Sequence, residues 1–242
     1  MITSYFSRVK DLLEEVERKE TPVLETGATK LAGALANGNI IHLFGCGHSH
    51  ELTEEVYYRA GGLVPIHPIF HEPLMLHEGA VRSSEFERKN DYAETFMKDE
   101  DIRPGDIMLV ISTSGRNPVP VDVALLAQAK GAYTIALTSK AYSESQPSRH
   151  KDGLRLLDAA DLVIDNHVPP GDALLEHERM DVKFAPGSTI VGAAIIHSMF
   201  SQGIAELADQ GIDPPVLLSG NIDGADEHNQ RLLKQYQDRI QL

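Results

Sequence analysis

The stretch Asn39–Val56, NIIHLFGCGHSHELTEEV, decides the fold of this chain. Its apolar run from Ile40 to Phe44 has the length of a buried β-strand. Gly45-Cys46-Gly47 then allows a tight turn and lets a ligand approach the backbone. The acidic segment that follows predicts the start of a helix, which is expected to end at Gly61-Gly62. Because the first turn of a helix has unpaired N–H groups and favours an anion, we expect this turn to hold a phosphate.

A second stretch, Asp106–Asn117 (DIMLVISTSGRN), repeats the pattern of apolar run, small-residue turn and helix. The turn carries the hydroxyl groups of Ser112, Thr113 and Ser114. Open α/β folds bind ligands at the carboxyl ends of parallel strands, so we expect the two turns to lie side by side and to suit a phosphate monoester. A standard dinucleotide fingerprint is not present, because His50 occupies the place of its third glycine.

Strands alternate with helices along the rest of the chain, which predicts an α/β fold with helices on both faces of a parallel sheet of about five strands. Further strands are expected within 63–69, 132–138 and 160–165, and a helix within 118–130. A long apolar helix, capped by Ser188 or Thr189, is expected to run through about Leu207. Two N-terminal helices are expected, about 4–19 and 21–36, with Pro22 at the first position of the second. The segment 70–90 is expected to be irregular and 166–187 a long loop. The expected organisation is an N-terminal helical extension (1–38), a central domain (39–209) and a C-terminal helical tail (210–242) packed on it.

The composition limits the function further. The formal charge of −14 argues against a general nucleic-acid or anionic-membrane surface. The single cysteine, Cys46, excludes an internal disulfide and is expected to be a small buried residue. No N-terminal signal and no long apolar span is evident, so we expect a cytoplasmic protein without membrane or nucleic-acid partners.

Several motifs, taken in order, resemble the sugar isomerase (SIS) domain family. These are Gly45–Ser49, Ser112–Gly115, Ala129–Thr138 and Pro186–Thr189, within a match of roughly 39–207. The resemblance implies a three-layer α-β-α, flavodoxin-like fold that binds phosphorylated sugars or amino sugars. It also implies a homodimer or higher homo-oligomer in which neighbours complete the site. No cofactor is expected.

Two branches of the family resemble the chain most. Ser114–Pro118 is similar to the S-G-R-T-P of N-acetylmuramic acid 6-phosphate etherases, and His77–Ala80 is similar to their V-E-G-A segment. His197 matches the position of a histidine in the closing helix of phosphoheptose isomerases. The whole chain most resembles an uncharacterised bacterial set of SIS-domain proteins. The resemblance therefore implies a phosphosugar ligand more strongly than one reaction.

The resemblance also implies which residues bind the sugar phosphate, although the same residues could only cap helices and close turns. They are Gly47, His48, Ser49, Ser112, Thr113, Ser114, Asn117 and Ser188. Gly47 and Gly115 are expected to let the ligand approach the backbone.

Catalysis in both branches begins with removal of a proton next to a carbonyl, which needs a positioned base. The candidates are Glu55, Glu78 and His197. Each has a structural alternative: a pair between Glu55 and Arg59, a surface position for Glu78 and a core position for His197. Arg59 stands where both branches place a catalytic glutamate, which is a departure from the family pattern.

These residues leave three functions open. The first is an isomerase or an etherase-like lyase, and the second is a non-catalytic sugar-phosphate sensor or regulator, which the Arg59 departure supports. A dehydrogenase using Glu72 to bind ribose is the weakest, because the third glycine is missing. Clustered histidines raise zinc as a minor hypothesis, but no H-E-x-x-H motif is present.

Overall fold

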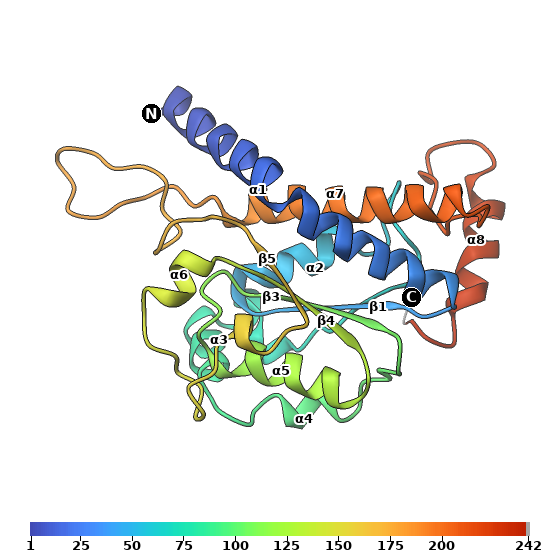
Figure 1. Ribbon diagram of the computed structural model, residues 1–242, viewed down its shortest axis with the longest axis horizontal. Helices are drawn as coiled ribbons and strands as arrows, with labels where there is room; N and C mark the ends of the chain where they lie inside the picture. Colours follow the sequence, from blue (N-terminus) through green and yellow to red (C-terminus); the bar gives the residue numbers. More distant parts are fainter. Residues whose placement is uncertain (241–242) are drawn as a thin grey trace.

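The computed structural model describes residues 1–240 and shows a five-stranded parallel sheet with helices on both faces (Figure 1). The strand order is β2-β1-β3-β4-β5, the flavodoxin-like order, so the expected fold class is confirmed. The strands are β1 (Ile41–Gly45), β2 (Ile66–Pro68), β3 (Ile107–Ile111), β4 (Tyr133–Thr138) and β5 (Leu162–Asp165).

Successive strand residues alternate between two hydrophobic cores, as the pleat of a strand requires. Ile41 and Leu43 belong to the core beneath α1 and α7, whereas Phe44 packs in the opposite core. The first core is covered by α1 (Ile2–Ala36), α2 (Glu51–Glu55) and α7 (Ser188–Asp209). The second is covered by α3 (Ala80–Glu87), α4 (Glu94–Met97) and α5 (Pro118–Ala129). Two further helices are α6 (Lys140–Glu144) and α8 (Ala225–Tyr236).

The N-terminal segment corrects the prediction of two helices, because α1 continues through Pro22 without a break. A proline inside a helix removes one hydrogen bond and crowds the preceding turn, so the sequence pattern predicts a boundary there. Tertiary contacts on both sides of Pro22 outweigh that cost. Val16 and Leu31 are buried in the core, and the buried Glu20 accepts hydrogen bonds from the Asp165 N–H (3.2 Å) and from His167 (2.9 Å).

Two other segments also differ from their predicted form. The helix after the first turn is short: a 3₁₀ turn (Gly47–His50) precedes α2, which ends at Glu55 and not at the Gly61-Gly62 pair. The segment 70–90 is not irregular throughout, because it contains α3 and two 3₁₀ turns. By contrast, 166–187 is a long loop that projects as an arm, with one bridge between Leu175 and Phe184 (Figure 1).

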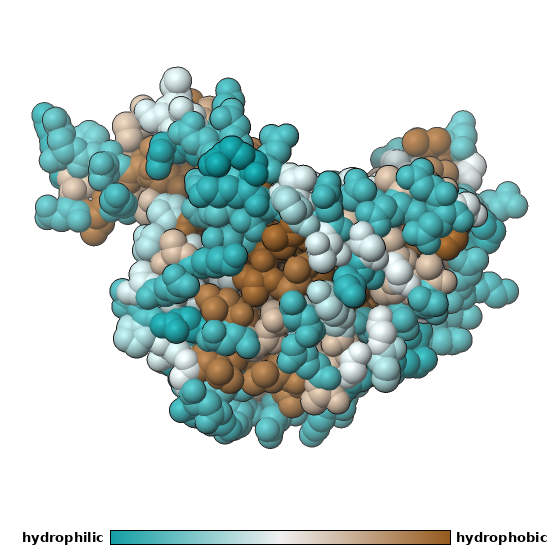
Figure 2. Space-filling model, in the orientation of Figure 1, coloured by the Kyte–Doolittle hydropathy of each residue, from teal (hydrophilic) through white to brown (hydrophobic). Residues whose placement is uncertain are grey.

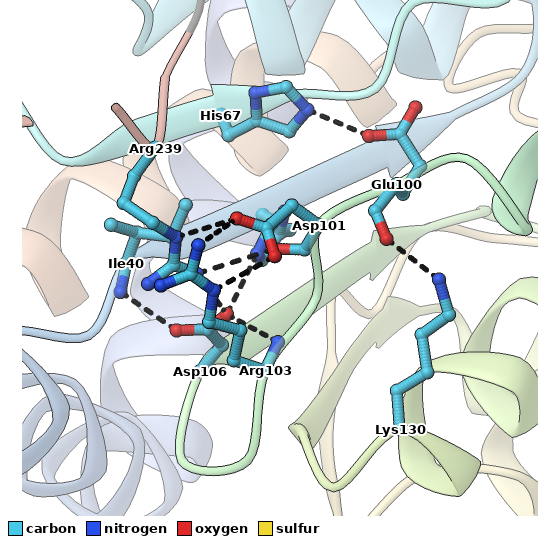
Figure 3. Close-up of polar contacts among 9 residues, drawn as sticks. Ile40, His67, Glu100, Asp101, Arg103, Asp106, Lys130 and Arg239 are labelled. Atoms are coloured by element: carbon cyan, nitrogen blue, oxygen red, sulfur yellow. Dashed lines mark hydrogen bonds and ion pairs between the residues drawn. The ribbon is translucent and has the colours of Figure 1, made fainter. Parts of the chain in front are cut away.

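The amino edge of the sheet carries a buried polar network (Figure 3). The carboxylate of Asp106 accepts hydrogen bonds from the Ile40 N–H (3.1 Å) and the Arg103 N–H (2.8 Å). It also contacts Nε2 of His42 at 3.1 Å and pairs with Arg239 at 2.7 Å. Arg239 follows α8, so this ion pair attaches the C-terminal segment to the sheet.

Seen in the orientation of Figure 1, the surface of the molecule is mostly hydrophilic, with hydrophobic residues gathered near the centre of this face (Figure 2).

Among residues 1–240, only α7 is long and apolar enough to cross a membrane by length and composition. Core helices pass the same test, and α7 buries Val191, Ile195 and Met199 in the core that it shares with α1. Its apolar character is therefore explained by packing inside the fold.

Candidate functional site

The two glycine-containing turns lie side by side at the carboxyl edge of the sheet, as predicted. β1 and β3 are parallel neighbours, and Gly45 pairs with Ile111 at the last position of each strand. The chain then leaves β1 into the turn Cys46–His50 and leaves β3 into the turn Ser112–Asn117. The topology of the sheet therefore places both turns at the ligand-binding edge of an open α/β fold.

The first turn requires glycine chiefly at Gly45. A Cβ atom there would lie 2.5 Å from the Ser49 carbonyl oxygen, closer than any side chain allows. Gly47 has a left-handed backbone (φ +58), and a Cβ there would meet nothing nearer than Leu76 at 3.8 Å. His48 is exposed and Ser49 is half-buried, so both remain accessible beside this turn.

The three hydroxyls of the second turn differ in their hydrogen bonding. Ser112 is buried, and its Oγ accepts a hydrogen bond from the Gly115 N–H (3.3 Å). Thr113 and Ser114 are half-buried, and their hydroxyls have no hydrogen-bond partner within residues 1–240. Gly115 has φ +57, and a Cβ on it would lie 2.7 Å from Thr138 Oγ1. The protein's own packing therefore requires a glycine here, and the approach of a ligand to its backbone stays a prediction.

Four of the predicted binding residues line a small hollow at this edge: His48, Ser49, Thr113 and Ser188. The remaining lining residues are Leu52, Ile111, Leu137, Asn166, Thr189 and Gly192. Gly47, Ser112, Ser114 and Asn117 do not line it. The hollow therefore combines hydroxyl and imidazole groups with an apolar floor.

The start of α7 is capped differently from the prediction. Neither Ser188 nor Thr189 is the cap, because α7 begins at Ser188 after Gly187. Asp172, on the arm, accepts hydrogen bonds from the Gly187 N–H (3.0 Å), the Ser188 N–H (3.0 Å) and the Ser188 hydroxyl (2.6 Å). The hydroxyl of Ser188 is thus engaged while it lines the hollow.

Asn117 is buried and already has protein partners at the N-cap of α5. Its Oδ1 accepts a hydrogen bond from Arg149 Nη1 (2.9 Å). A hydrogen bond from Asn117 also reaches the carboxyl of Glu87, whose pKa is raised by burial against the lowering effect of that bond. The sequence analysis did not identify Glu87 or Arg149 as site residues. Glu87 lies in a segment that was expected to be irregular, and Arg149 lies in a polar surface loop 32 residues after Asn117.

The structure brings together two of the three candidate bases. Glu55, on α2, and His197, on α7, lie 3.2 Å apart between Oε1 and Nε2. Arg59 also pairs with Glu55, and its Nη1 lies 3.4 Å from His197 Nε2. The hydrogen bond with His197 is the largest cause that lowers the pKa of Glu55, Arg59 adds to it, and burial opposes both. Glu55 is therefore ionised at neutral pH, as a general base must be.

This cluster is separate from the hydroxyl-lined hollow. Arg59 and His197 line an apolar groove with Leu63, Phe200 and Ile204. His197 is nine residues after Ser188 on α7, or about 13 Å of helical rise. A ligand held by both regions would have to extend along α2 and α7.

Glu78, the third candidate, lies apart from the other two. It ends a 3₁₀ turn (Leu76–Glu78), it is exposed, and its ion-pair partner is His77 at 3.8 Å. The His77 ring lies 6.2 Å from the ring of His50, so this loop lies beside the first turn. No hydrogen bond or ion pair links Glu78 to Glu55 or His197 within residues 1–240.

The clustered histidines have separate partners. His67 contacts Glu100 at 2.8 Å, and His71 contacts the Tyr92 hydroxyl at 2.7 Å. Within residues 1–240, no group of three or more His, Cys, Asp or Glu side chains is arranged to hold a metal ion. Cys46 is buried, and burial raises the pKa of its thiol well above the usual value. The prediction that Cys46 is a small buried residue is confirmed.

Comparison with known families identifies the chain's relatives. A model of the SIS domain matches residues 4–139. A UPF0309 protein of Halalkalibacterium halodurans is 60% identical over 242 residues, which cover 100% of this chain and 97% of the relative. A UPF0309 protein of Caldanaerobacter subterraneus is 38% identical over 243 residues, with 99% of each chain covered.

Solved structures share the fold at low sequence identity. Phosphoheptose isomerase GmhA from Neisseria gonorrhoeae has a TM-score of 0.53 and 16% identity, covering 84% of this chain and 97% of its own. The sugar isomerase domain of an RpiR transcription factor from Sphaerobacter thermophilus has a TM-score of 0.53 and 11% identity, covering 98% of each chain. The Vibrio vulnificus NanR protein complexed with ManNAc-6P has a TM-score of 0.51 and 10% identity, covering 98% of this chain and 69% of its own. At these identities the likeness concerns the fold.

Proposed function

The chain belongs to the SIS domain family, and from that premise we propose that it binds a phosphorylated sugar or amino sugar at the carboxyl edge of its sheet. The observation that carries the proposal is the set of hydroxyls of Ser49, Thr113 and Ser114, which have no hydrogen-bond partner within residues 1–240. Hydroxyls at strand ends and backbone N–H groups suit the oxygens of a phosphate monoester. A structural neighbour that is a phosphoheptose isomerase and another that is complexed with ManNAc-6P support the same ligand class.

We further propose that the bound sugar undergoes isomerisation or elimination, begun by proton abstraction next to its carbonyl. Glu55 is the proposed base, and His197 is the proposed group that moves a hydroxyl proton. Their separation of 3.2 Å lets them exchange a proton directly. The hydrogen bond with His197 and the ion pair with Arg59 lower the pKa of Glu55, which keeps it ionised between turnovers and makes it a weaker base.

A non-catalytic sugar-phosphate sensor is the second candidate function, and the Arg59–Glu55 ion pair favours it. A base that is held in an ion pair is a weaker proton acceptor. The neighbour from a transcription factor, RpiR, supports this alternative. The expected homo-oligomer remains a prediction for light scattering, and the exposed Ile2, Phe6 and Val182 supply apolar surface for it.

A two-step experiment tests these functions. Binding of phosphorylated and unphosphorylated sugars and amino sugars is measured first, by calorimetry and by the rise in melting temperature, since a ligand that prefers the folded state stabilises it. Each ligand that binds is then incubated in D₂O, and deuterium incorporation next to its carbonyl is followed by NMR. Glu55→Gln should reduce the exchange rate at least ~100-fold, because a positioned base contributes roughly that much. Glu54→Gln, an exposed neighbour on α2, is the matched control and should leave the rate unchanged.

The outcomes separate the two functions. Exchange that depends on Glu55 supports the enzyme. Binding without exchange for any ligand removes the proposed proton abstraction and leaves the sensor. Failure of every phosphosugar to bind would contradict the central proposal.

A further inference from the structure

The loop of residues 145–153 wraps around the second turn and carries an arginine to it. The Arg149 N–H donates to the Arg116 carbonyl (2.9 Å), and Arg116 Nε donates to the Pro147 carbonyl (3.0 Å). The guanidinium of Arg149 then donates to Asn117 Oδ1 (2.9 Å). Because Asn117 is the N-cap of α5, the Arg149 guanidinium lies at the start of that helix, and Asn117 follows Ser114 by three residues in the same turn.

The start of α5 offers unusually few backbone donors to an anion. A helix normally has four N–H groups without an intrahelical partner at its start. Here these positions are Asn117, Pro118, Val119 and Pro120. The two prolines have no N–H, so only Asn117 and Val119 can donate. An anion held beside this helix therefore needs donors from elsewhere in the fold.

Positive charge gathers at the same place in a chain whose formal charge is −14. Burial, followed by the nearby charges of Arg116 and Arg88, lowers the pKa of Arg149. Within residues 1–240, none of these arginines forms an ion pair with a carboxylate. A guanidinium has five N–H donors, and Arg149 uses one of them on Asn117, so several donors remain for a ligand.

We propose that Arg149 is a direct ligand of the phosphate held at the second turn, and that Arg116 beside it adds positive charge. This inference rests on the proposed function, because it names a residue that recognises the phosphate of the same ligand. Two guanidiniums would balance a phosphate dianion where the helix supplies few N–H groups. One competing anion is the carboxyl of Glu87, which shares Asn117 with Arg149.

The test uses the full chain and two probes, inorganic phosphate and the phosphosugar that binds most tightly in the ligand screen. Arg149→Gln should weaken binding of each probe about ten- to a hundredfold, the usual worth of a hydrogen bond to a charged group. It should also reduce the dependence of the dissociation constant on salt, because one charge contact is lost. Arg149→Lys should recover part of the affinity, since it keeps the charge and loses the fork of donors.

The matched control is Arg179→Gln, which removes the same charge from an exposed position on the arm. It should change neither the affinity nor its salt dependence. Arg149 is exposed, and its backbone bond to Arg116 survives substitution, so circular dichroism and melting should match the parent. A purely structural role for Arg149 would alter melting without altering the salt dependence.

Each result decides the inference. Weaker, less salt-dependent binding by Arg149→Gln supports it. Equal binding of a phosphosugar by Arg149→Gln and the parent overturns it while the proposed function stands. If the parent chain binds inorganic phosphate through Arg149 but binds no phosphosugar, Arg149 stands as an anion ligand and the proposed function is contradicted. If the parent chain binds neither probe, both the inference and the proposed function are contradicted.

Discussion

At the amino edge of the sheet, the carboxylate of Asp106 is fully buried and accepts hydrogen bonds from Ile40, His42, Arg103 and Arg239. At the carboxyl edge, the hydroxyls of Ser49, Thr113 and Ser114 are half-buried and have no partner within residues 1–240. A buried charge is tolerated only when protein groups pair with it, whereas a half-exposed hydroxyl can bond to water until a ligand replaces that water. The difference indicates that one edge maintains the fold and the other is kept available for binding.

The substitution Asp106→Ala should have the largest effect on the stabilising role of the amino edge. It leaves Arg239 without its buried partner and the N–H groups of Ile40 and Arg103 without an acceptor. We expect a loss of about 3–5 kcal/mol in the free energy of unfolding, measured by urea denaturation. Asp213→Ala is the control, because Asp213 is exposed and its pair with Arg231 should be worth less than about 1 kcal/mol. A similar loss in both variants would show that burial of the network does not matter.

Lowering the pH should reduce the free energy of unfolding in two steps, through His42 and Asp106 at the amino edge. Burial lowers the pKa of His42 despite its hydrogen bond to Asp106, and the charges of His67 and Arg239 lower it further. The unfolded chain therefore takes up this proton first, so stability should begin to fall as the pH drops below about 6.5, the ordinary value for histidine. Burial alone would raise the pKa of Asp106, but the hydrogen bonds from His42, Arg103 and Ile40 bring it below its usual value. The stability that Asp106 contributes is present above its unfolded value of about 3.9 and is lost as the pH falls toward its folded pKa.

The measurement is the free energy of unfolding at pH 7.5, 5.5 and 4, with an expected change of about 1.4 kcal/mol for each unit of pKa difference. His42→Gln should flatten the slope between pH 6.5 and 5, because the titrating group is removed. His177→Gln, on the exposed arm, is the control and should leave the slope unchanged. An unaltered slope in His42→Gln would exclude His42 as a source of the acid sensitivity.

The two edges also differ in how well the sequence predicted them. The carboxyl edge follows from local pattern: the apolar runs ending at Gly45 and Ile111 place both turns at one end of a parallel sheet. The amino edge depends on partners far apart in the chain, since Arg239 is 133 residues from Asp106. The pair of Arg149 with Asn117 was missed for the same reason. Pro22 misled the prediction because local propensity indicated a helix boundary there, whereas contacts with α7 and the strand β5 keep α1 continuous.

Paired substitutions within the second turn provide the finest comparison. Ser112→Ala removes a buried hydroxyl that accepts from the Gly115 N–H, so it should cost about 1 kcal/mol of stability. Ser114→Ala removes a hydroxyl without a partner, so stability should stay within about 0.5 kcal/mol. If Ser114 binds the phosphosugar, the same change should weaken binding about two- to tenfold, the worth of one neutral hydrogen bond. Ser84→Ala, whose hydroxyl bonds within its own helix, controls for the loss of a serine. The affinity for the phosphosugar is measured by calorimetry. If Ser114→Ala leaves it unaltered, a half-buried hydroxyl without a partner at this edge does not by itself mark a ligand contact.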